Sequence, residues 1–215
     1  MKLKELRILV ADDHSIVRKG LINSLLSNFP NTIIGEAENA AEVLNQMNKN
    51  FWDLVILDIS MPGRSGLEVL KDIKTSNPKI PVIIFSMYPE DQFAVRCIKA
   101  GASAYLSKDI SAKELEKAIN GILHGDHFFT PSVAALLTSE LQGNMGNKLA
   151  HETLSDREYQ VFLYISKGKS VSDIAAELNL SVKTISVYRS IILKKMNLKN
   201  NSEMMYYAFK NNLVS

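Results

Sequence analysis

The chain has 215 residues, of which 46% are hydrophobic, and a formal net charge of +2 at pH 7. This length exceeds the commonest single-domain size, so two domains are expected, one with a larger core than the other. No stretch approaches the ~20 consecutive apolar residues that span a bilayer, and no signal-peptide cleavage pattern follows the N-terminus. With Cys97 as the only cysteine, a disulfide framework and a cysteine-rich zinc site are both excluded. We therefore expect a cytoplasmic protein that does not contact a membrane.

The charge is unevenly distributed along the chain. Residues 1–150 contain 16 Lys and Arg against 17 Asp and Glu, whereas residues 151–215 contain 9 against 6. The short C-terminal part therefore has a modest basic excess, which permits nucleic-acid binding without proving it.

Five short apolar runs alternate with amphipathic segments through the first 123 residues. The runs have strand length and composition: LRILVADD, TIIGEAE, WDLVILDIS, PVIIFSM and SAYLSK. Each is followed by a segment with helical periodicity, and these begin with IVRKGL, AAEVLN, GLEVLK, EDQFAV and AKELEK. Five βα units in series predict an α/β doubly wound, five-stranded parallel sheet with helices on both faces.

Chemically active side chains stand where four of these strands end: Asp12, Asp13, Asp58, Ser86 and Lys108. Because the loops after parallel strands collect at one edge of a sheet, these groups should meet there. Three carboxylates in one place repel each other unless a cation is bound, and Mg²⁺ suits oxygen ligands of this kind. With an ammonium group and a hydroxyl beside them, they form the inventory required for phosphoryl transfer to an aspartate.

Each of these residues also has a simpler explanation. Asp13 could cap the helix that begins near residue 15, and Asp58 could be an ordinary loop residue. Ser86 could be a small filler, and Lys108 a solvated surface charge. Their joint occurrence at strand ends is much harder to attribute to chance.

The segments ILVADDHSIVRKGL, DLVILDISMPGRSGLEVL, PVIIFSMY and GASAYLSKD resemble the receiver domain of bacterial response regulators, over roughly residues 5–123. The resemblance implies a flavodoxin-like receiver at residues 1–124 in which Asp58 accepts phosphate from a sensor histidine kinase. It further implies that Asp13, Asp58 and the backbone carbonyl of Ser60 ligate Mg²⁺, with Asp12 acting through water.

The same resemblance assigns a switch. Ser86 and Lys108 would hold phosphoryl oxygens, and Tyr105 would turn inward when Ser86 moves toward the phosphoryl group. Tyr88, two residues beyond Ser86, would shield the acyl phosphate from water. The sequence departs from the receiver pattern at Asp109, where a proline commonly follows the lysine across a cis peptide.

Residues 125–150 have the character of a linker that is partly helical. TPSVAALLTSELQ predicts one helix with Thr130 as its N-cap and Pro131 at its first position. The next segment, GNMGNKLAHET, is rich in glycine and asparagine, which indicates a flexible connection.

Residues 151–215 show four helical patterns and predict a small all-α domain. Ser155 and Glu158 form a capping-box pattern. In SVSDIAAELNLSVKTISVYRSIILKKM two helices flank a tight NLS turn, which is typical of a helix-turn-helix. In the second helix Ile185, Ile192 and Met196 share the expected buried face.

A second stripe of that helix faces away from the core. The residues that we expect to contact base edges in the major groove are Lys183, Ser186, Val187 and Ser190. Those that we expect to contact DNA phosphates are Arg189, Lys194 and Lys195. The alternative is a solvated helix face without a partner.

LSDRE, IAAELNLS, KTIS and KKMNL resemble the LuxR-type helix-turn-helix, so the whole chain resembles the NarL/FixJ class of transcription regulators. The resemblance implies double-stranded promoter DNA and a sensor histidine kinase as partners, RNA polymerase as a further candidate, and a homodimer on activation. Many members carry Lys where this chain has Ser186 and His where it has Tyr188, although one branch has Ser and Tyr there. The dimer surface could include Met204, Tyr207 and Ala208, whose packing within their own domain is the alternative.

The leading hypothesis is a DNA-binding transcription regulator activated by phosphorylation of Asp58 in the presence of Mg²⁺. A second hypothesis is a regulator that acts through protein contacts and does not require phosphorylation. A Mg²⁺-dependent phosphatase that uses Asp58 on external substrates is disfavoured, because no substrate-recognition insert lies between the βα units. We therefore expect no enzyme activity beyond the receiver's own aspartyl phosphorylation and dephosphorylation.

Overall fold

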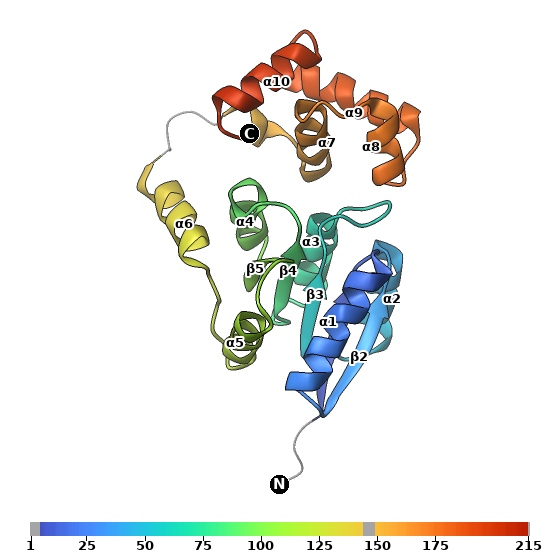
Figure 1. Ribbon diagram of the computed structural model, residues 1–215, viewed down its shortest axis with the longest axis vertical. Coiled ribbons are helices and arrows are strands. Elements are labelled where there is room, and N and C mark those ends of the chain that lie inside the picture. Colours follow the sequence, from blue (N-terminus) through green and yellow to red (C-terminus); the bar gives the residue numbers. More distant parts are fainter. Residues whose placement is uncertain (1–4, 144–148, 215) are drawn as a thin grey trace. The chain divides into compact units, whose positions relative to one another are not determined.

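The computed structural model describes residues 5–143 and 149–214, and the chain divides into two compact units, residues 1–138 and 139–215 (Figure 1). Within the described ranges, no helix is both long enough and apolar enough to cross a membrane. Each unit has its own core of buried apolar residues.

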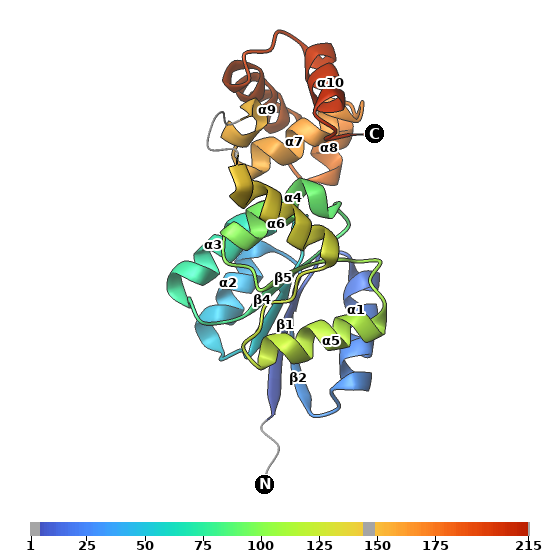
Figure 2. The same ribbon diagram turned by 90° about the vertical axis from the view of Figure 1, so that its left-hand side faces the viewer.

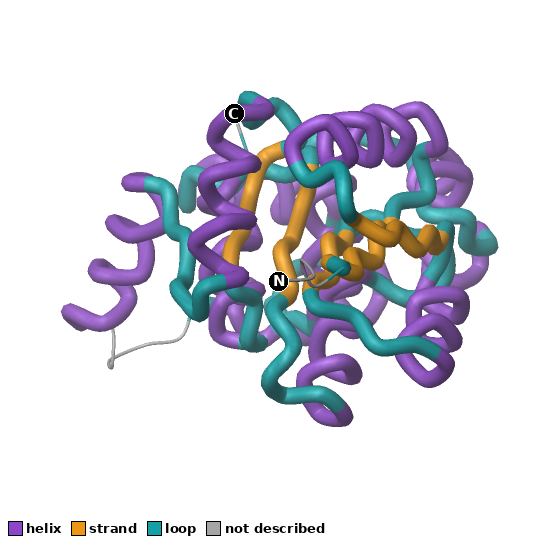
Figure 3. The backbone as a smooth tube through the Cα atoms, turned by 90° about the horizontal axis from the view of Figure 1, so that it is seen from below, coloured by secondary structure: helices purple, strands orange, loops and turns teal. Residues whose placement is uncertain are grey.

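The first unit is a five-stranded parallel sheet with the strand order β2-β1-β3-β4-β5. The strands are β1 (Leu6–Ala11), β2 (Thr32–Ala37), β3 (Leu54–Leu57), β4 (Val82–Ser86) and β5 (Ala104–Ser107). The connecting helices are α1 (Ser15–Asn28), α2 (Ala40–Lys49), α3 (Gly66–Ser76), α4 (Glu90–Lys99) and α5 (Ala112–Leu123). The predicted doubly wound α/β fold is therefore confirmed, and Figure 3 shows the strands side by side among the helices.

The sheet is buried on both faces, as the continuous apolar runs of its strands require. Figure 2 shows α1 and α5 on one side of the sheet and α2 and α3 on the other. Alternate strand residues such as Ile8, Val10, Leu54 and Ile56 share one core with α1 and α5. Because successive strand side chains point to opposite faces, their neighbours, such as Leu9, fill the other side.

Helix α6 (Pro131–Gly143) begins where the sequence predicts. The Thr130 hydroxyl accepts a hydrogen bond from the Val133 N–H (3.2 Å), so Thr130 is its N-cap. Between α5 and α6, Phe128 forms a parallel bridge with Ala104 at the free edge of β5. Of the segment predicted to be a flexible connection, residues 144–148 lie outside the described residues.

The second unit is entirely helical over residues 149–214. It comprises a short 3-10 helix (Ala150–Thr153), α7 (Asp156–Ser166), α8 (Val171–Glu177), α9 (Val182–Lys195) and α10 (Asn201–Lys210). Every residue of α7 from Arg157 to Ser166 is buried, and α7 packs against α8, α9 and α10. The predicted capping box is present, because Ser155 and Glu158 bind each other's backbone N–H. This central helix organises the small domain.

The turn between α8 and α9 is fixed by its own backbone. Asn179 adopts a left-handed conformation (φ 50°), which asparagine tolerates better than most residues. The N–H of Leu180 then donates to the carbonyl of Ala175 (2.8 Å), and Ser181 caps α9 by accepting from the Thr184 N–H (3.0 Å). The predicted helix-turn-helix geometry is confirmed.

Gly66, the first residue of α3, lies against the backbone of the loop that follows β3. A Cβ atom there would lie 1.9 Å from the carbonyl oxygen of Asp58, whereas a Cβ on Gly20 of α1 would have no neighbour within 4 Å. Only glycine therefore fits at position 66 without moving the Asp58 loop.

We expect Gly66→Ala to lower the free energy of unfolding of this unit by about 1–3 kcal/mol, because the loop must shift to admit the methyl group. Urea unfolding followed through Trp52, the single tryptophan, would measure this. The matched variant Gly20→Ala should stabilise the exposed helix by about 0.5–1 kcal/mol. Equal effects of the two variants would contradict the steric explanation.

Candidate functional site

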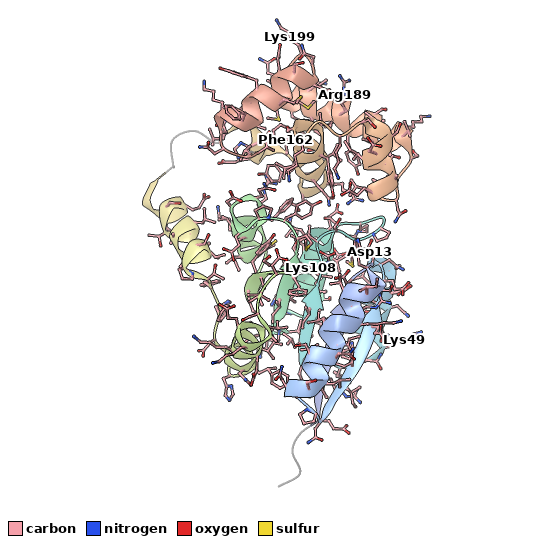
Figure 4. All side chains as sticks on the ribbon, viewed as in Figure 1. Asp13, Lys49, Lys108, Phe162, Arg189 and Lys199 are labelled. Atoms are coloured by element: carbon pink, nitrogen blue, oxygen red, sulfur yellow. The ribbon has the colours of Figure 1, made fainter. Side chains whose placement is uncertain are left out.

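Four charged side chains meet at the carboxyl ends of β1, β3 and β5. The Lys108 Nζ atom lies 2.7 Å from Oδ2 of Asp12 and 2.8 Å from Oδ2 of Asp58. Asp12 and Asp58 are each only 2% exposed, while Asp13 keeps 20% of its side chain open to solvent. Figure 4 shows Asp13 and Lys108 near this end of the sheet. The predicted acidic pocket is therefore assembled by the fold.

The electrostatics of the pocket are dominated by burial. Burial raises the pKa of the Asp58 carboxyl above its ordinary value, against the opposing effect of Lys108. Burial also works against the charge of Lys108, but the two carboxylates outweigh it and raise the Lys108 pKa. Lys108 is thus a buried, doubly paired cation, which rules out the solvated surface charge that its sequence context also permitted.

The donor set fits a hard divalent cation. Ligand atoms of Asp12, Asp13, His14 and Asp58 all lie within 4.8 Å of one another. Carboxylate oxygens are preferred ligands of Mg²⁺, and Asp13, at 20% exposure, leaves the pocket open to solvent. Ser60 also contributes its backbone here, because its N–H donates to the Asp58 carboxylate. Asp13 does not cap α1, whose N-cap position is held by His14.

Hydrogen bonds connect Ser86, whose carbonyl accepts from the Lys108 N–H, to the segment before α4. The Ser86 hydroxyl accepts from the Tyr88 N–H (3.1 Å), and the Tyr105 hydroxyl donates to the Tyr88 carbonyl (2.8 Å). Tyr105 is completely buried, and burial raises its pKa, so its hydroxyl stays protonated and able to donate. The Tyr88 ring packs against Phe93 of α4 in a tilted arrangement, with ring centroids 4.8 Å apart. The two predicted switch residues are therefore joined through one backbone segment.

The peptide after Lys108 is trans, since none of the peptide bonds in the described ranges is cis. The Lys108 N–H instead donates to the Ser86 carbonyl (2.9 Å), and the Asp109 N–H donates to the Ser107 hydroxyl (3.3 Å). Backbone bonds therefore place Lys108 without the proline that is common at the next position.

The proposed recognition helix, α9, has the two faces that its sequence predicts. Ile185, Ile192 and Met196 are buried. The opposite face is exposed along the residues assigned to the major groove and to one phosphate contact: Lys183, Ser186, Val187, Ser190 and Lys194. The hydroxyls of Ser186 and Ser190 bond to carbonyls one turn back in the helix. Polar and cationic side chains, together with Val187, thus line an exposed face of α9, and an α-helix fits the major groove of DNA.

Two of the predicted phosphate-binding residues also make contacts inside the domain. The Arg189 side chain, labelled in Figure 4, donates to Asn201 Oδ1 (2.6 Å), and Lys195 Nζ lies 2.7 Å from Glu158 Oε2. Neither contact is visible in the sequence pattern, because the partners lie 12 and 37 residues away. Both side chains are consequently held in place on the helix.

The sequence left open whether Met204, Tyr207 and Ala208 of α10 form a dimer surface or pack within their own domain. Met204 and Ala208 are fully buried in their own domain, and the Tyr207 hydroxyl lies 3.0 Å from Nδ1 of His151. These residues therefore pack within the domain. The apolar side chains of α10 that remain exposed are Met205, Tyr206 and Phe209.

Comparison with known proteins matches both units to described families. Residues 8–120 match the response regulator receiver domain, and residues 152–208 match the bacterial regulatory proteins of the luxR family. The response regulator GacA of Pseudomonas viridiflava is 31% identical over 97% of this chain and 98% of its own length. The response regulator UvrY of Escherichia coli is 30% identical over 98% of this chain and 96% of its own.

A solved structure of RcsB from Salmonella enterica serovar Typhimurium, bound to promoter DNA in the presence of the phosphomimetic BeF₃⁻, is also similar. It is 27% identical, with a TM-score of 0.59, and the alignment covers 95% of this chain and 98% of that one. The similarity therefore extends over both units.

The raised pKa of Asp58 means that the folded protein holds the proton of this carboxyl more tightly than the unfolded chain does. Its ionised form therefore destabilises the fold, and this cost is absent below the ordinary pKa of 3.8 and grows as the pH rises. In Mg²⁺-free buffer at pH 7 we expect Asp58→Asn to increase the free energy of unfolding.

Urea unfolding at several pH values would show this gain shrink as the pH approaches 4. As a control, Asp72→Asn removes an exposed carboxylate that pairs with Arg64, so its effect should stay below about 1 kcal/mol at every pH. If Asp58→Asn were less stable than wild type at pH 7, the raised pKa of Asp58 and its cost to stability would be contradicted.

Proposed function

The chain belongs to the response regulators that carry a LuxR-type DNA-binding domain, the NarL/FixJ family, and on that basis we propose that Asp58 phosphorylation controls its binding to promoter DNA. The observation that carries the proposal is the buried pocket in which Asp58 and Asp12 share Lys108, beside Asp13. The receiver-domain match supports a sensor histidine kinase as the phosphate donor.

In the proposed reaction, a carboxylate oxygen of Asp58 attacks the phosphorus of a phosphohistidine. A P–O bond forms at Asp58, the P–N bond to the kinase imidazole breaks, and the imidazole leaves with the electron pair and takes up a proton. Mg²⁺, when bound by Asp13, Asp58 and the Ser60 carbonyl with Asp12 acting through water, supplies positive charge that offsets the phosphoryl charge.

Lys108 and Ser86 supply the remaining stabilisation. Lys108 already contacts the Asp58 oxygen at 2.8 Å, so only a small movement is needed for its ammonium to follow the charge to a phosphoryl oxygen. The Ser86 hydroxyl now accepts a hydrogen bond from the Tyr88 N–H. In the proposed exchange, the Ser86 side chain would leave this N–H and donate its own O–H to the phosphoryl group. This exchange would release the Tyr88 segment, while Tyr105 already occupies its inward, buried position.

The output of the proposed switch is a homodimer on DNA. Lys183, Ser186, Val187 and Ser190 would reach base edges, while Arg189, Lys194 and Lys195 would contact phosphates. The basic excess of residues 151–215 is small, so one copy should bind weakly and two copies on paired half-sites should bind well. Because promoter DNA lies in the bacterial cytoplasm, we expect the protein to act there, with RNA polymerase as a further candidate partner.

The switch is tested by size-exclusion chromatography and DNA binding of wild type and Asp58→Ala, each with and without Mg²⁺ and beryllofluoride. We expect wild type alone to form dimers and to gain about 10-fold or more in affinity for promoter fragments, a coupling of at least ~1.4 kcal/mol. Identical behaviour of the two proteins would instead support a regulator that acts without phosphorylation.

The DNA interface is tested by removing one proposed phosphate contact. Lys194→Ala should reduce the slope of log affinity against log salt concentration by about one for each bound copy, since one fewer counterion is released. The matched variant Lys210→Ala, at the end of α10, removes a cation away from α9 and should leave the slope unchanged. If both variants change the slope equally, α9 is not the helix that contacts DNA.

A further inference from the structure

Arg18 of α1 is a buried cation whose role the sequence does not reveal. Only 5% of the residue is exposed, although α1 lies on the outside of the sheet and the neighbouring Lys19 is exposed. A buried guanidinium is costly unless each of its donors finds an acceptor. The contacts of Arg18 therefore indicate what its burial achieves.

The Arg18 guanidinium bonds to three different places in the receiver unit. Nη1 donates to the backbone carbonyl of Asp12 (2.7 Å), Nε donates to Glu36 Oε2 (2.8 Å), and Nη2 donates to Glu38 Oε1 (2.5 Å). The hydrogen bond to Glu36, together with the one to Glu38, raises the Arg18 pKa, so the charge is permanent. Arg18 thus joins the loop after β1 to the end of β2.

These contacts converge on the loop that presents the carboxylates. The Asp12 N–H donates to the Ala37 carbonyl (3.1 Å), so the backbone of this loop is held from both its amide and its carbonyl side. The His14 N–H in turn donates to Oδ1 of Asp12 (2.8 Å). Asp13 lies between these two residues, so the position of its backbone depends on the contacts that hold Asp12 and His14.

The effect of Arg18 on the pocket is positional. Its charge is offset by two carboxylates, and its bond to the loop ends on a backbone oxygen, so it adds little field at Asp58. A planar guanidinium can donate in three directions at fixed angles, whereas an ammonium or an apolar side chain cannot keep all three contacts. Groups that orient metal ligands from behind commonly change metal affinity 10–100-fold when they are removed.

We infer that Arg18 is a positioning residue for Mg²⁺ binding, because it holds the Asp12 carbonyl and thereby sets the place of Asp12 and Asp13. The inference rests on the proposed function, since it concerns the metal used in phosphorylation of Asp58. Removal of Arg18 should weaken Mg²⁺ binding and leave the phosphoryl-transfer step itself nearly intact once Mg²⁺ is saturating.

The test uses the full chain and four variants: Arg18→Met, Arg18→Lys, Arg7→Met and Asp58→Ala. Arg7 lies in β1 at the opposite end of the strand from Asp12, so it controls for the loss of an arginine from the same unit. Titration calorimetry would measure the Mg²⁺ dissociation constant. Phosphorylation by acetyl phosphate over a range of Mg²⁺ concentrations would separate half-saturation from the maximal rate.

For Arg18→Met we expect a Mg²⁺ dissociation constant and a half-saturating Mg²⁺ concentration about 10-fold higher, with a maximal rate close to that of wild type. Arg18→Lys should give an intermediate loss, because lysine can reach the Asp12 carbonyl but not both glutamates. Arg7→Met should match wild type. Should Arg18→Met fail to fold by circular dichroism, Arg18→Lys carries the same test.

A folded Arg18 variant with wild-type Mg²⁺ affinity, or one that loses maximal rate without any change in half-saturation, would overturn the inference. The proposed function would instead be refuted if wild type showed no Mg²⁺-dependent phosphorylation, or if Asp58→Ala were phosphorylated as well as wild type. The two failures are therefore distinguishable in one set of measurements.

Discussion

The ion pairs of Lys108 with Asp12 and Asp58 are the interaction on which the receiver unit depends. They join the ends of β1, β3 and β5, which enter one sheet only when β4 packs between β3 and β5, and they are almost fully buried. Burial, together with the neighbouring Asp12 carboxylate, raises the pKa of Asp58, although Lys108 opposes this shift. A site that is strained in this way favours the arrival of further positive charge, which suits the binding of a divalent cation and the transfer of a phosphoryl group.

The supports around this pocket are backbone atoms as much as side chains. Gly66 permits α3 to begin against the Asp58 carbonyl, Arg18 holds the Asp12 carbonyl, and the Ser86 hydroxyl holds the Tyr88 N–H. These contacts fix the loops that carry the reacting groups, so the reacting groups keep their positions. The same contacts connect the pocket to α4, because the Tyr88 segment leads directly into that helix.

The second unit is stabilised differently, because a small helical domain can bury only a small hydrophobic core. It buries α7 on all sides and fixes helix ends with Ser155, Ser170 and Ser181, each of which caps a helix. The outer face of α9 is exposed, and at its edges Arg189 bonds to Asn201 and Lys195 pairs with Glu158. A rigid helix with an exposed polar face is what groove recognition requires.

The sequence by itself determined the succession of strands and helices along the chain, the helix caps at Thr130 and Ser155, and the meeting of acidic and basic groups at one sheet edge. These features follow from periodicity and from the geometry of parallel sheets, which act over a few residues or through one general rule. It also separated the buried stripe of α9 from its exposed stripe, because a 3.6-residue period fixes both.

Only the tertiary structure decided which partner each charged side chain finds. The sequence around Arg18 is equally compatible with an exposed side chain. Its acceptors Glu36 and Glu38 lie 18 and 20 residues further along the chain, at the end of β2. The inward position of Tyr105 and the tie between Lys195 and Glu158 were likewise fixed by packing. The reason is physical: such contacts depend on how helices and sheet lie against each other, and local periodicity carries no information about those distances.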